Sequence, residues 1–172
     1  ISAGRDWTMA GQTVIAAGGS DVLGRAGRDI TLGVVSLTNG TVNRAAFDAG
    51  RNIIDANLGA VNVEETVAGS TSSVSFRAGG RIGDASGLQE NENENAIDLN
   101  VDRVAANSAT GIYLHEIAAG EHLVVRDVEA VNIAVNVTRA NFNSTQTTVA
   151  LPIVPATHAA ASLSDLTTTN NG

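Results

Sequence analysis

Side chains able to act as general acids and bases gather in the second half of the sequence. They are His115, Glu116, His122, Asp98, Asp102 and Asp127. Enzymes that cleave polysaccharides hold such groups close together on one face of the fold. Adjacent strand residues point to opposite faces, so His115 and Glu116 do not face one substrate, and no spacing marks an acid and base pair. We therefore expect solvent-facing polar residues and not an enzyme.

Two stretches could hold a hard cation. Glu90, Glu92 and Glu94 alternate with asparagine, and carboxylate and amide oxygens are the ligands that calcium prefers. Residues 18–29 loosely resemble nine-residue calcium-binding repeats, but those need tandem units of nine. A solvated loop explains the acidic run without a metal. We expect no cofactor and keep calcium as the alternative.

The most conspicuous charged feature is a row of arginines, Arg5, Arg28 and Arg51, which recur at a constant interval in the sequence. Such a row could present cations to an acidic glycan and is the possible contact site. Stacked like charges about 4.8 Å apart repel by about 1 kcal/mol per pair at the dielectric of water. Asp6 and Asp29 would offset this repulsion, which favours an exposed corner where opposite charges neutralise each other.

Composition excludes several classes of protein. The 172 residues carry a net charge of −8, which argues against nucleic acid as a partner. The absence of cysteine rules out disulfides and thiolate metal sites. No apolar run is long enough for membrane insertion. The sequence opens at Ile1 inside a repeat unit, so we expect it to be flanked by more repeats of a longer chain.

These side chains are positioned by a repeat. Its alanines are Ala3, Ala26, Ala49 and Ala78, each followed by one of the glycines Gly4, Gly27, Gly50 and Gly79. Four positions after each alanine stand Trp7, Ile30, Ile53 and Ile82. The alanines are 23, 23 and 29 positions apart, which indicates a unit of 23 with one insertion of six. We predict that these residues form columns in a structural ladder.

A unit of this length predicts an all-β fold, a right-handed parallel β-helix or β-solenoid with about 23 residues per coil. Helical repeats need about 33 residues or more, whereas three short strands with three corners fit this length, and the coils would stack about 4.8 Å apart. The repeat glycines are expected at a corner with positive φ, and the alanines are expected to face a narrow interior. A less regular third side would stack Val14, Leu37 and Ala60.

The chain divides into two parts. Residues 1–140 alternate apolar and polar positions as strands do and are predicted to form the coils. Residues 141–172 are a polar tail rich in Thr, Ser and Asn. The tail is expected to be a linker or a strand lying on the solenoid or on a neighbour. The loops at 62–77 and 84–96, where coils are lengthened, are the expected variable contact points.

The stretch from Ala26 to Leu32 is similar to the coil motif of filamentous haemagglutinin-like adhesins. The stretch from Ile97 to Val137, which includes residues 104–114, resembles segments of very large repetitive surface proteins. The resemblance implies an extracellular protein at the bacterial cell surface that attaches to a host surface or glycan, or a passive stalk. We therefore expect a structural or adhesive segment whose binding is multivalent and weak per site. A self-assembling extracellular filament or sheath subunit is the alternative, followed by a carbohydrate-active β-helix enzyme.

Overall fold

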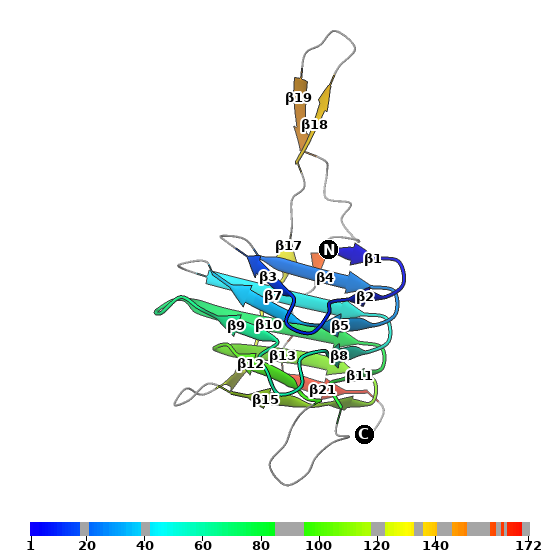
Figure 1. Ribbon diagram of the computed structural model, residues 1–172, viewed down its shortest axis with the longest axis vertical. Coiled ribbons are helices and arrows are strands. Elements are labelled where there is room, and N and C mark those ends of the chain that lie inside the picture. Colours follow the sequence, from blue (N-terminus) through cyan, green and yellow to red (C-terminus); the bar gives the residue numbers. More distant parts are fainter. Residues whose placement is uncertain are drawn as a thin grey trace.

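The structure is a computed structural model that describes residues 1–17, 21–38, 42–84, 95–117, 123–132, 136–140, 146–150, 159–160, 163 and 165–169. The described residues form β-strands and turns without a helix, so the all-β prediction is confirmed. Accordingly, this part of the chain contains no helix that could span a bilayer. Figure 1 shows the strands piled on one another along one axis.

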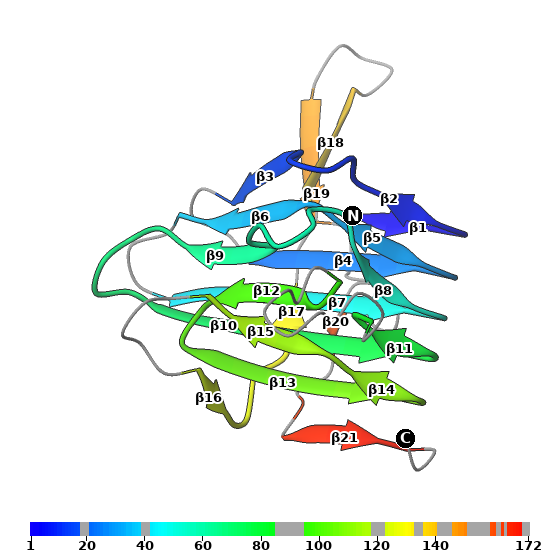
Figure 2. The same ribbon diagram turned by 60° about the horizontal axis from the view of Figure 1, so that its bottom comes forward.

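Three parallel sheets make up the body of the molecule (Figure 2). The first contains β1 (Ser2–Ala3), β4 (Val22–Ala26), β7 (Val42–Ala49), β10 (Thr71–Ala78), β13 (Arg103–Ser108) and β16 (Val124–Val125). The second contains β2 (Trp7–Thr8), β5 (Ile30–Leu32), β8 (Ile53–Asp55), β11 (Arg81–Ile82) and β14 (Gly111–Ile112). The third contains β3 (Val14–Ala17), β6 (Val34–Leu37), β9 (Val63–Glu65), β12 (Ile97–Asn100) and β15 (Leu114–Glu116). The chain therefore visits the sheets in a fixed cyclic order, and we call one such pass a circuit.

Strand register places the repeat residues above one another in the first two sheets. Ala26 lies opposite Ala3 and Ala49, and Ala78 lies opposite Ala49. In the second sheet the partners run in the order Trp7, Ile30, Ile53, Ile82 and Ile112. From one circuit to the next, both sheets therefore advance by the same number of positions along the chain.

The third sheet does not follow this spacing. Val14 pairs with Val34, and Leu37 pairs with Ala17, so the expected column of Val14, Leu37 and Ala60 is wrong. Later partners are Val35 with Val63, and Val63 with Leu99. Insertions fall in the corners before and after this sheet, and they shift its register from circuit to circuit.

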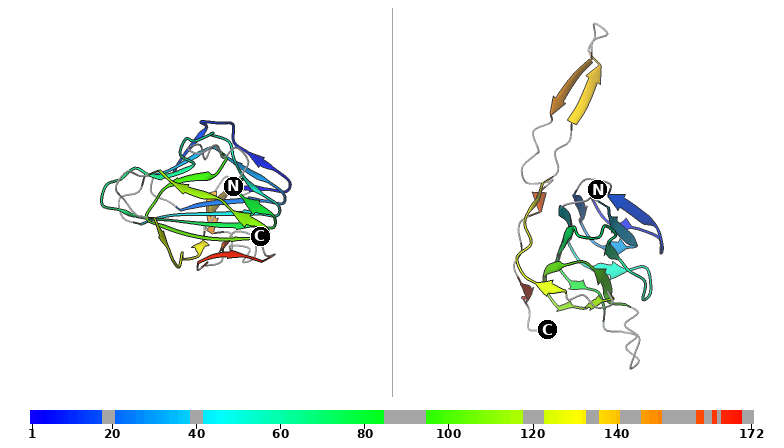
Figure 3. Two further views of the ribbon diagram at one scale, coloured as in Figure 1. Left: turned by 90° about the horizontal axis from the view of Figure 1, so that it is seen from below. Right: turned by 90° about the vertical axis from the view of Figure 1, so that its left-hand side faces the viewer.

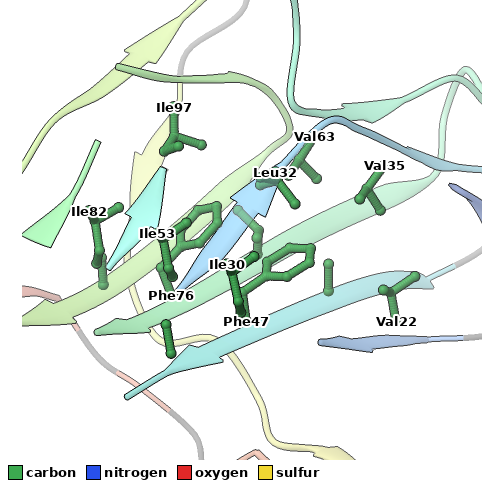
Figure 4. Packing of buried hydrophobic residues seen from close by; sticks show 14 of the residues in the cluster. Val22, Ile30, Leu32, Val35, Phe47, Ile53, Val63, Phe76, Ile82 and Ile97 are labelled. Carbon is green, nitrogen blue, oxygen red and sulfur yellow. The ribbon is translucent and has the colours of Figure 1, made fainter. Parts of the chain in front are cut away.

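Apolar columns fill the space between the sheets (Figure 4). Phe47 and Phe76 are register partners whose rings stack with centroids 5.5 Å apart. Gly24 occupies the same column one circuit earlier, and the Trp7 ring covers the space above it, 6.1 Å from the Phe47 ring. A Cβ on Gly24 would lie 2.1 Å from the Trp7 ring. This glycine is therefore required by close packing of the indole.

The corner glycines have a different role from the one expected. None of Gly4, Gly27, Gly50 and Gly79 has φ in the left-handed region, so the prediction of positive φ is wrong. A Cβ on Gly50 would instead lie 2.2 Å from the carbonyl oxygen of Gly27, and one on Gly79 would lie 2.3 Å from that of Gly50. The glycines are needed because successive backbones approach closely at this corner.

The remaining strands form a ribbon on the outer face of the first sheet. β17 (Val131–Asn132) pairs antiparallel with β20 (Ala159–Ala160), and β18 (Asn136–Ala140) with β19 (Gln146–Ala150). Val131 is buried against Leu23 and Ala46, so the ribbon covers part of the outer face of the first sheet. In two views the β18–β19 hairpin projects past the end that carries β1 (Figures 1 and 3).

The last described strand lies beside the solenoid-like body. β21 (Leu166–Thr168) pairs in parallel with residues 106–108 of β13, while β16 pairs with residues 103–104 of the same strand. The two short strands thus share one sheet edge, and part of the predicted tail completes the first sheet.

Candidate functional site

The arginine row lies at the corner between the first and second sheets. Arg28 reaches back to Asp6, with 3.5 Å between its Nε and Asp6 Oδ1. Arg51 makes a two-pronged salt bridge to Asp29, and this hydrogen bonding lowers the pKa of the Asp29 carboxyl. Within the described part of the chain, Arg5 makes no ion pair. Two of the three predicted contact cations are thus paired with carboxylates of the preceding circuit.

Aspartate and asparagine in the same motif satisfy backbone groups. Asp6 accepts a hydrogen bond from the Asp29 N–H at 3.3 Å, and Asp29 accepts one from the Asn52 N–H at 3.1 Å. Asn52 in turn accepts one from the Arg81 N–H at 3.1 Å. The whole corner motif therefore joins circuits along the axis, and this role accounts for its repetition without a ligand.

Two further arginines join neighbouring strands on the outer face of the first sheet. Arg25 forms a salt bridge to Asp48 at 2.9 Å. Arg44 donates hydrogen bonds to both carboxylate oxygens of Asp21, with 2.7 Å between its Nη2 and Asp21 Oδ2. Arg44 also binds Glu129 of the crossing ribbon at 3.1 Å. Charge on this face thus holds the ribbon to the sheet.

Among the acid and base candidates, the structure brings Asp98 and His115 together. They are register partners in the third sheet, and 2.7 Å separates Asp98 Oδ1 from His115 Nδ1. Asp98 is fully buried, and its Oδ2 has no hydrogen-bond partner among the residues that the structure describes. Burial raises the pKa of Asp98, an effect that Asp55 reinforces and His115 opposes. The pair was not predicted, because the step of 17 positions between its members is not the repeat spacing.

A polar network supports this pair. The Asp98 N–H donates to Asn62 Oδ1 at 2.8 Å, and the Asn62 amide donates to Asp55 at 2.7 Å and to the Leu32 carbonyl at 2.9 Å. Asp55 also caps the turn that follows it by accepting from the Asn57 N–H at 2.7 Å. The inserted residues before β9 are thereby fixed on the third sheet.

The other candidates do not converge on Asp98 and His115. Glu116 lies opposite Leu99, on the other face from His115 as expected, and accepts a hydrogen bond from the Leu123 N–H. His122 and the acidic residues 90–94 lie outside the described residues. Wherever the structure describes the chain, no three histidine or acidic side chains gather as a metal site would require.

Asp102 lies in a cleft among the described residues, which has a volume of about 430 Å³. The cleft is on the corner between the third and first sheets and is lined by Glu65, Thr66, Val67, Ala68, Gly69, Ser70, Ser72, Asn100, Val101 and Asp102. Two carboxylates, three hydroxyls and an amide therefore border it, and none of the described lining residues is cationic.

Unequal corner lengths create the cleft. Val63 and Val74 are 11 positions apart, whereas their register partners Leu99 and Val104 are only five apart. The turn at 66–70 consequently overhangs the shorter corner at 101–102. In both body views the β9–β10 connection reaches farther out than the β12–β13 corner (Figures 1 and 2).

The prediction of a contact loop at 62–77 is therefore largely wrong. Residues 63–65 and 71–78 are strands β9 and β10, and the free turn is limited to 66–70. The lengthened repeat did signal this region, but the cleft also needs Asn100 and Asp102 from the next circuit. The loop predicted at 84–96 lies mostly outside the described residues.

The chain matches no protein-family model, no curated protein and no solved structure.

Proposed function

We propose that the chain is a right-handed parallel β-helix that serves as a structural and adhesive segment of a secreted or bacterial cell-surface repeat protein. Right-handedness is inferred from general chain geometry, since parallel crossover connections are right-handed in about 98% of cases. The basic coil is the unit that separates Ala26 from Ala49, and insertions lengthen it. The sequence resemblance to large surface adhesins is the basis for the proposed location.

One observation carries this proposal: the stabilising contacts run along the axis. The stacked Trp7, Phe47 and Phe76 rings and the Ile30, Ile53 and Ile82 column join circuit to circuit. The salt bridges of the arginine corner also join circuits. A body in which each unit is stabilised mainly by its neighbours acts as a stiff shaft and displays its corners at fixed spacing.

Pulling on single molecules tests the shaft. The chain is placed between two marker domains and stretched from its ends. We expect circuits to detach one after another, with each step releasing the chain between one second-sheet position and the next, such as Trp7 to Ile30. This corresponds to steps of roughly 80–100 Å at about 3.5 Å per residue. Unfolding of the three sheets in a single step would contradict a body built from serially joined circuits.

Adhesion is tested on beads that carry many copies of the chain. Such beads should adhere to glycan-bearing surfaces at densities where one copy does not, because the binding is multivalent. Beads coated with heat-unfolded chain are the matched control. Equal adhesion of folded and unfolded chains would rule out a role for the β-helix surface.

A filament or sheath subunit is the second candidate, favoured by the strand edges at one end. β1, β2 and β3 are the outermost strands of the three sheets, and Ile1 and Val14 beside them are more than half exposed. Such edges recruit further strands. Light scattering over a wide dilution range distinguishes the candidates, since a constant particle size contradicts self-assembly.

A further inference from the structure

Hydrogen bonds between two circuits fix the floor of the cleft at the corner between the third and first sheets. The Asp102 N–H donates to Ser72 Oγ at 3.0 Å, while Asp102 Oδ2 accepts from the Ser72 N–H at 2.6 Å. This reciprocal pair joins two circuits at the floor of the cleft. Glu65 is fixed in the same way, since it accepts from the Val67 N–H at 2.8 Å and from the buried Asn43 amide at 2.5 Å.

The hydroxyl groups around the cleft donate their protons to acceptors of the protein itself. Thr66 Oγ1 donates to the Leu37 carbonyl at 3.4 Å, and Ser70 Oγ donates to the Val67 carbonyl at 2.9 Å. Ser72 Oγ donates to Asp102 Oδ2 at 3.2 Å. Ser70 Oγ also accepts from the Asn43 amide at 3.4 Å, and Ser72 Oγ from the Asp102 N–H, but a hydroxyl oxygen has two lone pairs. What remains on these groups is therefore acceptor capacity, and ionised carboxylates only accept. The cleft therefore presents a surplus of acceptors and suits a ligand rich in donors.

The charge and polarity of the cleft lining further restrict the class of ligand that it can bind. The two carboxylates in the described lining repel sulfated or uronic sugars, and the polar side chains of the lining are a poor match for an apolar molecule. The volume of about 430 Å³ falls among small-ligand pockets, which span roughly 300–1,000 Å³. A sugar offers several hydroxyl donors on a compact ring and no charge to oppose the carboxylates.

We propose that this cleft binds a short stretch of uncharged glycan through the Glu65 and Asp102 carboxylates. The inference rests on the proposed adhesive function and names its ligand class. It also places glycan contact on a different corner from the arginine row, whose charges are largely paired. The described lining contains no aromatic side chain on which a ring could stack, so we expect binding to be weak per site and strong only when many copies act together.

The test measures binding of methyl β-lactoside, a neutral disaccharide, by ligand-observed NMR and by titration with the folded chain. Ala68→Arg is the blocking variant, because Ala68 is exposed on the turn and a long cationic side chain there competes for the carboxylates. Asp102→Asn is the second variant and keeps an acceptor while removing the charge. We expect loss of binding in the first and about fivefold to tenfold weaker binding in the second.

Asp127→Asn is the matched control, since Asp127 is exposed and does not line the cleft. It should bind as the unchanged chain does, and melting curves establish that each variant is folded. Three results would overturn the proposal: no saturable binding of the disaccharide, preferential binding of polygalacturonate, or binding of calcium alone that Asp102→Asn abolishes. None of these would alter the stepwise unfolding expected of the shaft, so the two ideas fail separately.

Discussion

Replacing Gly50 with alanine tests the close approach of successive backbones at the arginine corner. The added Cβ would lie 2.2 Å from the Gly27 carbonyl oxygen, so the two circuits must move apart. Overpacking of this kind costs about 1–3 kcal/mol. The separation also strains the Gly50 N–H bond to Ala26 and the Arg51 N–H bond to Arg28, which are 2.9 and 2.8 Å long, and each is worth about 1 kcal/mol. Together these terms give an expected loss of about 3–5 kcal/mol.

Gly4→Ala is the matched control, because Gly4 belongs to the same motif. A Cβ there meets no heavy atom within 4 Å, and φ is outside the left-handed region. Alanine should therefore leave stability unchanged or raise it by about 0.5 kcal/mol through the unfolded state. The two substitutions are chemically identical, so the contrast isolates the contact with the preceding circuit.

Urea unfolding followed by circular dichroism and by fluorescence of Trp7, the single tryptophan, measures both changes. A loss of about 3 kcal/mol corresponds to a midpoint shift of about 1–2 M urea at an m-value of about 2 kcal/mol/M. Equal destabilisation by Gly4→Ala and Gly50→Ala would refute the reasoning, since it would indicate a backbone conformation that only glycine adopts at every corner.

Three other substitutions probe the core, the buried carboxylate and the ribbon. Phe76→Ala removes a fully buried ring and should cost about 3–5 kcal/mol in urea unfolding; a cost below about 1 kcal/mol contradicts the stacked column. Burial raises the pKa of Asp98, so the folded chain holds that proton more tightly than the unfolded chain, and stability falls as pH rises from about 4 through the folded pKa. Asp98→Asn should remove this part of the pH dependence, measured as the difference in unfolding free energy between the two proteins. Arg44→Met should loosen the ribbon, seen as faster amide exchange at Val131 with little change at Ile53.

The first two sheets could be predicted from the sequence because their spacing is kept. Ala26 and Ala49 are the last residues of their strands in the first sheet. Ile30 and Ile53, the next residues in the second sheet, each follow four positions later. A constant corner keeps two strands in the same register relative to each other, whatever happens elsewhere in the circuit. Counting from one repeat to the next therefore identified true neighbours.

The rest depends on corners whose lengths vary. Ile53 and Val63 are 10 positions apart where Ile30 and Val35 are five apart, so no fixed spacing finds third-sheet partners such as Asp98 and His115. The reason for the corner glycines was also beyond the sequence, because a left-handed φ and a close backbone contact both select glycine.

Variation in corner length also indicates where a stack of circuits of this kind can gain a recess. The arginine corner cannot lengthen without losing the Asp29–Arg51 salt bridge and the hydrogen bonds of its aspartate column. The corner between the third and first sheets differs in length by six positions between two adjacent circuits, and Val74 still pairs with Val104. Where the long turn of one circuit lies over the short turn of the next, a recess forms that neither circuit would have alone. The proposed binding residues Glu65 and Asp102 thus come from two circuits whose stacking the repeated corner already fixes.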